Sequence, residues 1–84
     1  MSTSTLHLDL HPIAQNGAAI EAALTNIMTQ AVEKRVRRIE IITGKGSGQL
    51  MKRVKRFLQQ PHIKIRYNRI DVDAKNHGRL FVYL

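Results

Sequence analysis

The sequence predicts an α/β domain, and more specifically an α+β two-layer sandwich in which a mixed four-stranded sheet carries two helices on one face, in the order βαβαββ. Short segments in which apolar and polar residues alternate indicate strands. Two longer segments with apolar residues three and four positions apart indicate amphipathic helices. Glycine and proline residues between these segments mark where each element ends.

The first predicted strand and helix lie close to the amino terminus. In LHLDLHP, residues 6–12, three leucines alternate with titratable side chains, and this spacing puts His7, Asp9 and His11 in a row on the solvated face of a strand. Residues 16–35 then predict a helix that Asn16 caps, with Glu21 in its first two turns. The apolar stripe of this helix consists of Ile20, Leu24, Ile27, Met28 and Ala31.

The remaining elements follow in the second half of the chain. Residues 36–44 read as a buried strand, and residues 46–61 predict a helix with Ser47 as its cap and Pro61 as its stop. The apolar stripe of this second helix consists of Leu50, Met51, Val54, Phe57 and Leu58. Residues 62–68 and 79–84 alternate like strands, and the polar residues 69–78 between them include a turn at Asn76, His77 and Gly78.

The order of elements also predicts where a ligand binds. Strand, helix and strand at this spacing form a βαβ unit, so the first two strands run parallel and their carboxyl ends lie at one edge of the sheet. Ligands of such sheets bind at that edge. If the two strands are neighbours or one strand apart, Asp9, His11 and Lys45 converge there.

Size and composition limit the class of protein. The 84 residues suit one domain over residues 6–84, preceded by a flexible polar tail over residues 1–5. The chain has no cysteine, which excludes disulfides and thiolate metal sites, and no apolar run approaches the roughly 20 residues of a membrane span. There is no signal-peptide pattern, so we expect a cytoplasmic location.

The net charge of the chain points to an anionic partner. Fourteen Lys and Arg against six Asp and Glu leave +8, and nucleic acid is the commonest intracellular polyanion. The alternative is a charge that serves solubility alone. The placement of the basic residues favours a partner: Lys52, Arg53, Lys55 and Arg56 cover the solvent side of the second helix, and residues 49–60 contain no acid.

Other charged and aromatic residues extend this surface. The further basic residues are Arg35, Arg37, Arg38, Lys64, Arg66 and Arg69. Tyr67, Phe81 and Tyr83 could stack on bases, although aromatic residues on the strands of a small sheet are more often part of the core.

The glycine-rich segment TGKGSG, residues 43–48, precedes the second helix and predicts a phosphate-binding loop. Its residues are Thr43, Gly44, Lys45, Gly46, Ser47 and Gly48, whose backbone amides and Lys45 ammonium group suit an anion. The spacing is not that of a P-loop, and Gln49 and Lys64 stand where a dinucleotide site needs glycine and an acid. A turn that only reverses the chain is the alternative.

The row of titratable groups allows three interpretations. Two histidines and a carboxylate could bind a metal, but along one strand they span about 13 Å, too far for one ion. We therefore expect no metal ligands and no cofactor, although a divalent ion would not conflict with the sequence. His11 could instead act as an acid or base, with Asp9 fixing its tautomer. The third interpretation is a solvated strand face without function.

Two motifs in this sequence resemble those of the Smr domain, the small MutS-related module. These are LDLHP at the end of the first strand and ITGKGSGQL at the end of the second, which match the L-D-x-H and [HT]-G-x-G signatures in the expected order. The resemblance runs from about Leu8 to Leu84. It implies a fold like the carboxyl-terminal domain of bacterial translation initiation factor three, binding to nucleic acid and, in many members, endonuclease activity on DNA or RNA.

The resemblance also implies roles for individual residues. The catalytic pair falls on Asp9 and His11, and the glycine loop falls on Thr43, Gly44, Lys45 and Gly46, whereas His7 has no counterpart. Two positions depart from the family pattern. Pro12 follows the histidine where glycine is usual, and the glycine-rich turn before the last strand is reduced to Gly78.

These observations predict a nuclease, alone or within a larger protein assembly of the kind that serves DNA repair or recombination. His11 would activate water or an RNA 2′-hydroxyl, Lys45 and the loop amides would stabilise the phosphoryl oxygens, and Lys52, Arg53, Lys55, Arg56 and Arg38 would hold the strand. One alternative is a non-catalytic module that recognises structured or branched nucleic acid. Another is a protein-interaction domain that uses the open face of the sheet.

Overall fold

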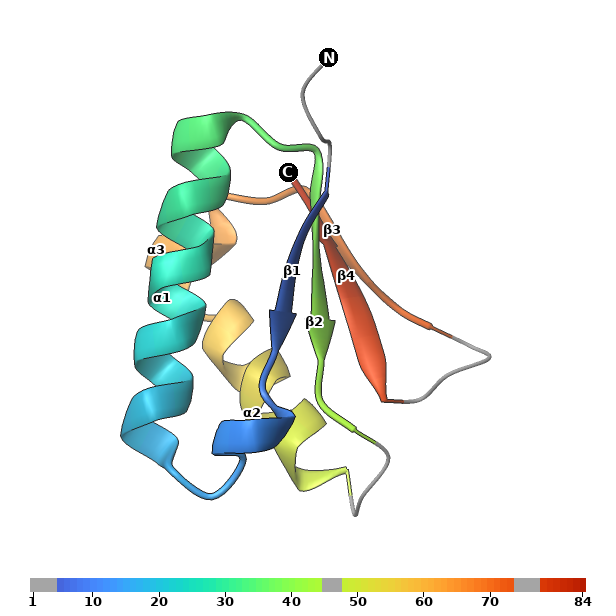
Figure 1. Cartoon of the computed structure of the whole chain (residues 1–84). Helices are drawn as coiled ribbons and strands as arrows, with labels where there is room; N and C mark the ends of the chain where they lie inside the picture. Colours follow the sequence, from blue (N-terminus) through green and yellow to red (C-terminus); the bar gives the residue numbers. More distant parts are fainter. Residues whose placement is uncertain (1–4, 45–47, 74–77) are drawn as a thin grey trace.

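The computed structural model describes residues 5–44, 48–73 and 78–84. Its elements are β1 (Thr5–Asp9), the 3₁₀ helix η1 (His11–Ile13), α1 (Gly17–Lys34), β2 (Arg38–Ile42), α2 (Gln49–Leu58), α3 (Pro61–Lys64), β3 (Arg69–Val72) and β4 (Arg79–Tyr83). The helices form one layer and the strands the other, and the second face of the sheet is open (Figure 1). This is the two-layer architecture that the sequence predicts.

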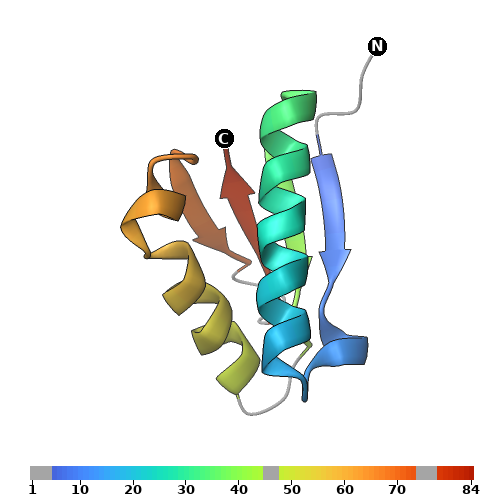
Figure 2. The same cartoon turned by 90° about the vertical axis from the view of Figure 1, so that its left-hand side faces the viewer.

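The sheet is mixed, with the strand order β1-β2-β4-β3. β1 pairs with β2 in parallel, and β4 pairs antiparallel with both β2 and β3. The carboxyl ends of β1 and β2 therefore lie side by side, as the βαβ pattern predicts. The amino-terminal ends of α1 and α2 lie at this same edge of the sheet (Figures 1 and 2).

The core lies between the sheet and the helices. The strand register places Ile39, Ile41, Leu80 and Val82 under the helices, and all four are fully buried. The five predicted stripe residues of α1 are buried against them. The Asn16 side chain caps α1 as predicted, because its Oδ1 accepts a hydrogen bond of 3.0 Å from the amide of Ala19.

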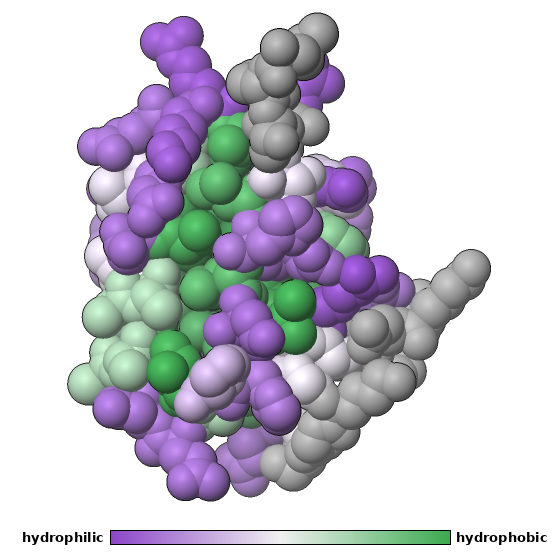
Figure 3. All heavy atoms as spheres, viewed as in Figure 1, coloured by the Kyte–Doolittle hydropathy of each residue, from purple (hydrophilic) through white to green (hydrophobic). Residues whose placement is uncertain are grey.

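The apolar side chains also reach the surface beside β1. Figure 3 shows a band of hydrophobic atoms over the region of α1 and the β1 edge, bordered by hydrophilic side chains. Leu6, Leu8, Ile13 and Ala23 are partly buried residues that pack against the core. None of the helices in the described ranges is long and apolar enough to cross a membrane.

The second helix begins and ends differently from its prediction. Gly48 is the residue before its first turn, and Ser47, the predicted cap, lies outside the described residues. Val54, Phe57 and Leu58 are buried as predicted. The helix ends at Leu58, and Pro61 does not stop it but opens the next helix, because its fixed φ suits the first helical turn.

The prediction of a strand over residues 62–68 is wrong. Residues 61–64 form α3, and the amides of Ile63 and Lys64 donate to the carbonyl of Gln60. The alternating pattern misleads here because Ile63 is buried while Ile65 is 85% exposed, so the two isoleucines do not share a buried face. Ile63 reaches the core from α3, and Tyr67 packs against the core from the segment that follows this helix.

The third strand is instead Arg69–Val72, inside the segment that we predicted to be a polar connection. It is an edge strand with one face open to solvent, which tolerates charged side chains on alternate positions. Ile70 pairs with the buried Val82, whereas Arg69 and Asp71 contact each other at 3.4 Å on the open face. The predicted turn residues Asn76 and His77 lie outside the described residues.

Candidate nucleic-acid and phosphate site

His11 does not belong to the row on the first strand. β1 begins at Thr5, a residue assigned above to the tail, and ends at Asp9, after which His11, Pro12 and Ile13 form η1. Leu10 is fully buried and its amide donates to the carbonyl of Ile42 over 2.9 Å, which holds the turn against the end of β2. The alternation therefore extends only from His7 to Asp9, and the exposed His11 projects from the turn at the edge of the sheet.

The Asp9 carboxylate fixes this turn through the backbone. Its Oδ1 accepts a hydrogen bond of 2.9 Å from the amide nitrogen of His11. We expected the carboxylate to orient the imidazole ring, and its hydrogen bond goes to the main chain instead. A short acidic side chain two residues before an amide commonly makes this contact, which sets the start of the turn. Asp9 consequently positions His11 through its backbone amide.

The His11 ring lies against the end of the second strand. A Cβ atom placed on Gly44 would lie 3.1 Å from Cδ2 of His11, and Gly44 has a φ of 82°. A side chain at this position would press on the ring and would also adopt a backbone conformation that L-residues rarely take. The two strand ends therefore meet at His11 and Gly44. Lys45, Gly46 and Ser47 lie outside the described residues.

The first part of the glycine loop is not free to bind phosphate. The amides of Thr43 and Gly44 donate to the carbonyl oxygen of Gly78 over 2.7 and 3.0 Å, and the buried Thr43 hydroxyl donates to the same oxygen over 3.1 Å. These donors, which we predicted would face an anion, hold the loop to the start of β4. The role of Thr43 and Gly44 in a phosphate-binding loop stays a prediction, and in this structure their donors contact the Gly78 carbonyl.

Backbone donors come instead from the first turn of α2. Among the described residues, the first hydrogen bond of this helix runs from the Lys52 amide to the Gly48 carbonyl over 3.0 Å, and the amides of Gln49, Leu50 and Met51 lie in the turn before it. The positive end of the helix dipole lies at the same place. The sequence-based prediction combined the dipole of this helix with the amides of the glycine-rich segment, and it did not name the amides of the first helical turn as donors.

These groups line one hollow of about 240 Å³. Its walls are His11, Ala14, Thr43, Gly44, Gly48, Gln49, Leu50 and Met51. A histidine therefore shares a depression with the amino-terminal turn of a helix, an arrangement suited to an anionic group. Within the described ranges, no three His, Asp or Glu side chains come together in a way that could hold a metal ion.

Four basic side chains continue from this hollow along α2. Lys52, Arg53, Lys55 and Arg56 are exposed, as predicted for the solvent side of the helix. Arg38 does not join them. It lies on the open face of the sheet, where its Nε donates to the Thr5 hydroxyl over 2.9 Å and its guanidinium lies 4.9 Å from the centre of the Phe81 ring.

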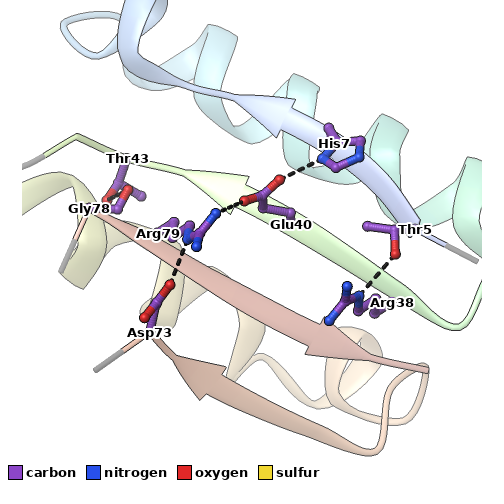
Figure 4. A network of polar contacts seen from close by, with 8 residues as sticks. All are labelled: Thr5, His7, Arg38, Glu40, Thr43, Asp73, Gly78 and Arg79. Carbon is purple, nitrogen blue, oxygen red and sulfur yellow. Dashed lines mark hydrogen bonds and ion pairs between the residues drawn. The ribbon is translucent and has the colours of Figure 1, made fainter. Parts of the chain in front are cut away.

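The open face carries a polar network that the sequence analysis missed (Figure 4). Glu40, which is 8% exposed, accepts hydrogen bonds from Nδ1 of His7 at 2.5 Å and from Arg79 at 2.6 Å, and Arg79 also donates to Asp73 at 2.7 Å. Burial alone would raise the pKa of Glu40. The bonds from His7 and Arg79 outweigh burial and hold this pKa below its ordinary value. His7 thus belongs to a network that links three strands.

The aromatic side chains divide between the two faces. Phe81 and Tyr83 lie on the open face, where Arg79 approaches Phe81 and Arg69 lies 4.4 Å from the centre of the Tyr83 ring. Tyr67 packs against the core and donates its hydroxyl to the Leu58 carbonyl, and burial raises the pKa of Tyr67. The arginines on this face are engaged with rings and carboxylates of the same sheet.

Comparison with known proteins agrees with this fold and with the two strand-end motifs. The family model of the Smr domain matches residues 8–84. The chain belongs to the Smr domain family. It is similar in structure to the Smr domain of Thermus thermophilus MutS2, with a TM-score of 0.73 and 18% sequence identity over 98% of each chain. The comparison with curated proteins gives no match.

The structure shows the surroundings of Pro12 and Gly78, the two positions where the motifs of this Smr domain differ from the expected pattern. Pro12 lies in the first turn of η1, where a fixed φ near −65° fits and the missing amide has no helical partner to lose. Gly78 is buried and its single carbonyl accepts from the amide of Gly44 and from the amide and hydroxyl of Thr43. The Gly78 carbonyl therefore anchors the end of β2.

Proposed function

We propose that this Smr domain cleaves phosphodiester bonds of DNA or RNA, with His11 as the catalytic residue. The observation that carries the proposal is the meeting of His11 with Gly44 and the first turn of α2 in one hollow. A phosphate seated there faces an imidazole that can accept a proton and backbone amides that can bind its oxygens. The membership in a family of nucleic-acid-binding and nuclease modules supports the same proposal.

The proposed reaction transfers a proton to His11. The imidazole removes a proton from water or from a 2′-hydroxyl, whose oxygen forms a bond to phosphorus as the bond to the leaving oxygen breaks. The leaving oxygen takes up a proton from solvent water, and the His11 imidazolium then returns its proton to solvent. The negative charge that builds on the phosphoryl oxygens lies at the positive end of α2, where the amides of Gln49, Leu50 and Met51 stabilise it. Lys45 would add a full positive charge to this stabilisation.

Asp9 is a positioning residue in this proposal. Its carboxylate holds the amide of His11 and thereby the turn that presents the ring. The basic side chains of α2 bind the flanking phosphates, because they are exposed, close in sequence to the hollow and free of acidic neighbours from residue 49 to residue 60.

A second candidate is a non-catalytic module that binds structured or branched nucleic acid by shape. The engagement of the Thr43 and Gly44 amides with Gly78 favours it, because fewer donors remain to stabilise a developing charge. Both candidates need the basic side of α2. They differ in whether a product forms.

One assay separates these candidates. The full chain and its His11→Ala variant are incubated with labelled single-stranded and double-stranded DNA and RNA, with and without a chelator. Cleavage by the wild type that the variant lacks supports the nuclease. Tight, salt-sensitive binding by both proteins without any product supports the binding module.

A further inference from the structure

The outer edge of β1 has no strand beside it among the strands that the structure describes. β1 pairs with β2 alone, at one end of the order β1-β2-β4-β3. The Leu10 amide donates to the Ile42 carbonyl, and main-chain groups along a strand face its two sides alternately. The amides and carbonyls of Thr5, His7 and Asp9 therefore face away from β2, where a further strand can bind them.

Uncharged side chains flank this edge on the helical face of the sheet. Leu6 and Leu8 of β1 are partly buried, and Figure 3 shows hydrophobic surface along this part of the molecule. α1 lies between α2 and β1 (Figure 2), and Glu21 and Leu24 line the hollow that separates α1 from α2. By the helical period, the opposite flank of α1 faces the β1 edge with uncharged residues only, which are Ala19, Ala23, Asn26 and Gln30. A partner on this edge therefore contacts leucine, alanine and amide side chains.

The charge of the chain is unevenly divided between this edge and the rest of the molecule. All 14 Lys and Arg residues follow residue 33, and residues 5–33, which form β1, η1 and most of α1, contain none. Arg38 of the neighbouring strand is engaged with the Thr5 hydroxyl and the Phe81 ring. Nucleic acid therefore meets no basic side chain from residues 5–33. Two copies of this chain, by contrast, can meet at this edge with their basic α2 helices on the far sides.

We propose that β1 pairs antiparallel with β1 of a second copy of this chain, across a two-fold axis at His7. In this register Thr5 lies opposite Asp9 of the second copy, so the outward amides and carbonyls of both strands bind one another. On the helical face, Leu6 lies opposite Leu8 of the second copy as an apolar cross-strand pair. The two His7 rings meet beside the Glu40 carboxylates that they contact. The edge is thus complementary to itself.

The helical layer has room for this arrangement. α1 packs on both β1 and β2, which places its axis about half a strand spacing inward from β1. With strands about 4.8 Å apart, the two α1 axes then lie about 10 Å apart. Packed helices lie about 8 to 10 Å apart, and the small side chains of Ala19 and Ala23 permit such an approach.

Sedimentation equilibrium of the full chain measures the association. We expect the mass to rise with concentration from 9.6 kDa towards twice that value, with a Kd on the order of 10 to 100 μM for so short a contact. His7→Lys should raise this Kd about fivefold or more, because two ammonium groups lie opposite each other while each can still pair with Glu40. Val72→Lys adds the same charge at an exposed position on β3, at the other edge, and should change the Kd less than about twofold.

Single cysteine variants test the register. The chain has no cysteine, so a bis-maleimide crosslinker that joins two thiols of His7→Cys joins two copies. Residues opposite each other in a hydrogen-bonded pair have Cα atoms about 5.5 Å apart, within the span of a short crosslinker. At equal concentration, His7→Cys should form the covalent dimer about tenfold faster than Val72→Cys, whose cysteine lies at the other edge.

Three results would overturn the proposal, whether or not the chain cleaves nucleic acid. A chain that stays monomeric well above the expected Kd leaves the β1 edge to a strand of another protein. Association that His7→Lys does not weaken, or equal crosslinking of the two cysteine variants, places the contact elsewhere. Protection of the β1 amides from hydrogen exchange by added single-stranded DNA, in a chain that stays monomeric, assigns the edge to nucleic acid.

Discussion

His11 owes its position to contacts that its neighbours make through the backbone. Asp9 holds its amide, Leu10 ties the turn to Ile42, and Gly44 leaves room for its ring. The sequence pattern identified Asp9, His11 and Gly44 through their motifs. It could not show that the Asp9 carboxylate faces the main chain, since the end of a strand is set by tertiary contacts and not by the alternation of residue types.

At the residue scale, Gly44→Ala should destabilise the fold more than Gly48→Ala. Both glycines have a φ above 80°, so each alanine should cost about 1 kcal/mol of unfolding free energy for the backbone alone. Gly44→Ala adds a methyl group against the His11 ring, whereas nothing lies within 4 Å of a Cβ on Gly48. Urea denaturation of both variants measures the difference. Equal losses of unfolding free energy would show that the His11 ring does not clash with a side chain at position 44.

The buried carboxylate of Glu40 gives a prediction for pH. Because its pKa in the folded protein lies below the ordinary value of 4.5, its stabilising contribution is complete above that pH and declines as the pH falls below it. Glu40→Gln should lower the unfolding free energy by about 1 kcal/mol near neutral pH, and the difference from the wild type should shrink under acid. Thermal unfolding over a pH series checks this.

The exposed Glu33 supplies the control for this measurement. Glu33→Gln removes the same charge without touching His7 or Arg79, and should change the unfolding free energy by less than about 0.5 kcal/mol. If the difference in unfolding free energy between Glu40→Gln and the wild type grew as the pH fell, the lowered pKa of Glu40 would be contradicted.

At the scale of elements, both long helices and the first, second and last strands could be predicted, because each has one clear period and a marked end. The third strand and α3 could not. The segment HIKIRYN carries apolar residues at positions that fit both periods, and the choice depends on whether Ile63 alone or Ile63 and Ile65 together reach the core. That choice is made by packing against α2 and the sheet.

A pair of substitutions tests this correction. Ile63→Ala should cost about 2 to 4 kcal/mol of unfolding free energy, because Ile63 is buried in the core. Ile65→Ala should change it by less than about 0.5 kcal/mol, since its side chain is exposed. Chemical denaturation measures both. Similar large losses would indicate the strand that the alternation predicts.

At the scale of the whole molecule, the parallel pair β1 and β2 brings two distant motifs to one edge of the sheet, and the order of elements was enough to predict this. The direction of each side chain was not predictable in the same way. Arg38 belongs to the strand β2 but faces away from the helices, so the net charge of +8 is not spread over one surface. The basic side chains of α2 are the positive charges that lie beside the hollow at His11.

Binding should therefore depend on which cations are removed. The double variant Lys52→Ala with Arg56→Ala should weaken binding to a single strand and reduce the slope of log Kd against log salt by about 1 to 2. Arg37→Ala with Arg66→Ala removes the same charge at exposed positions off α2 and should affect the slope less. Fluorescence anisotropy from low to high salt measures both. Equal effects would mean that the net charge, and not α2, binds the strand.

The most direct measurement of the central claim compares cleavage and binding by His11→Ala on the same labelled strand. With protein in excess, we predict that the variant binds within about threefold of the wild-type Kd while its cleavage rate falls by about a hundredfold or more, since a general base contributes on that order. Cleavage by the variant at the wild-type rate would contradict the assignment of His11 as the catalytic residue.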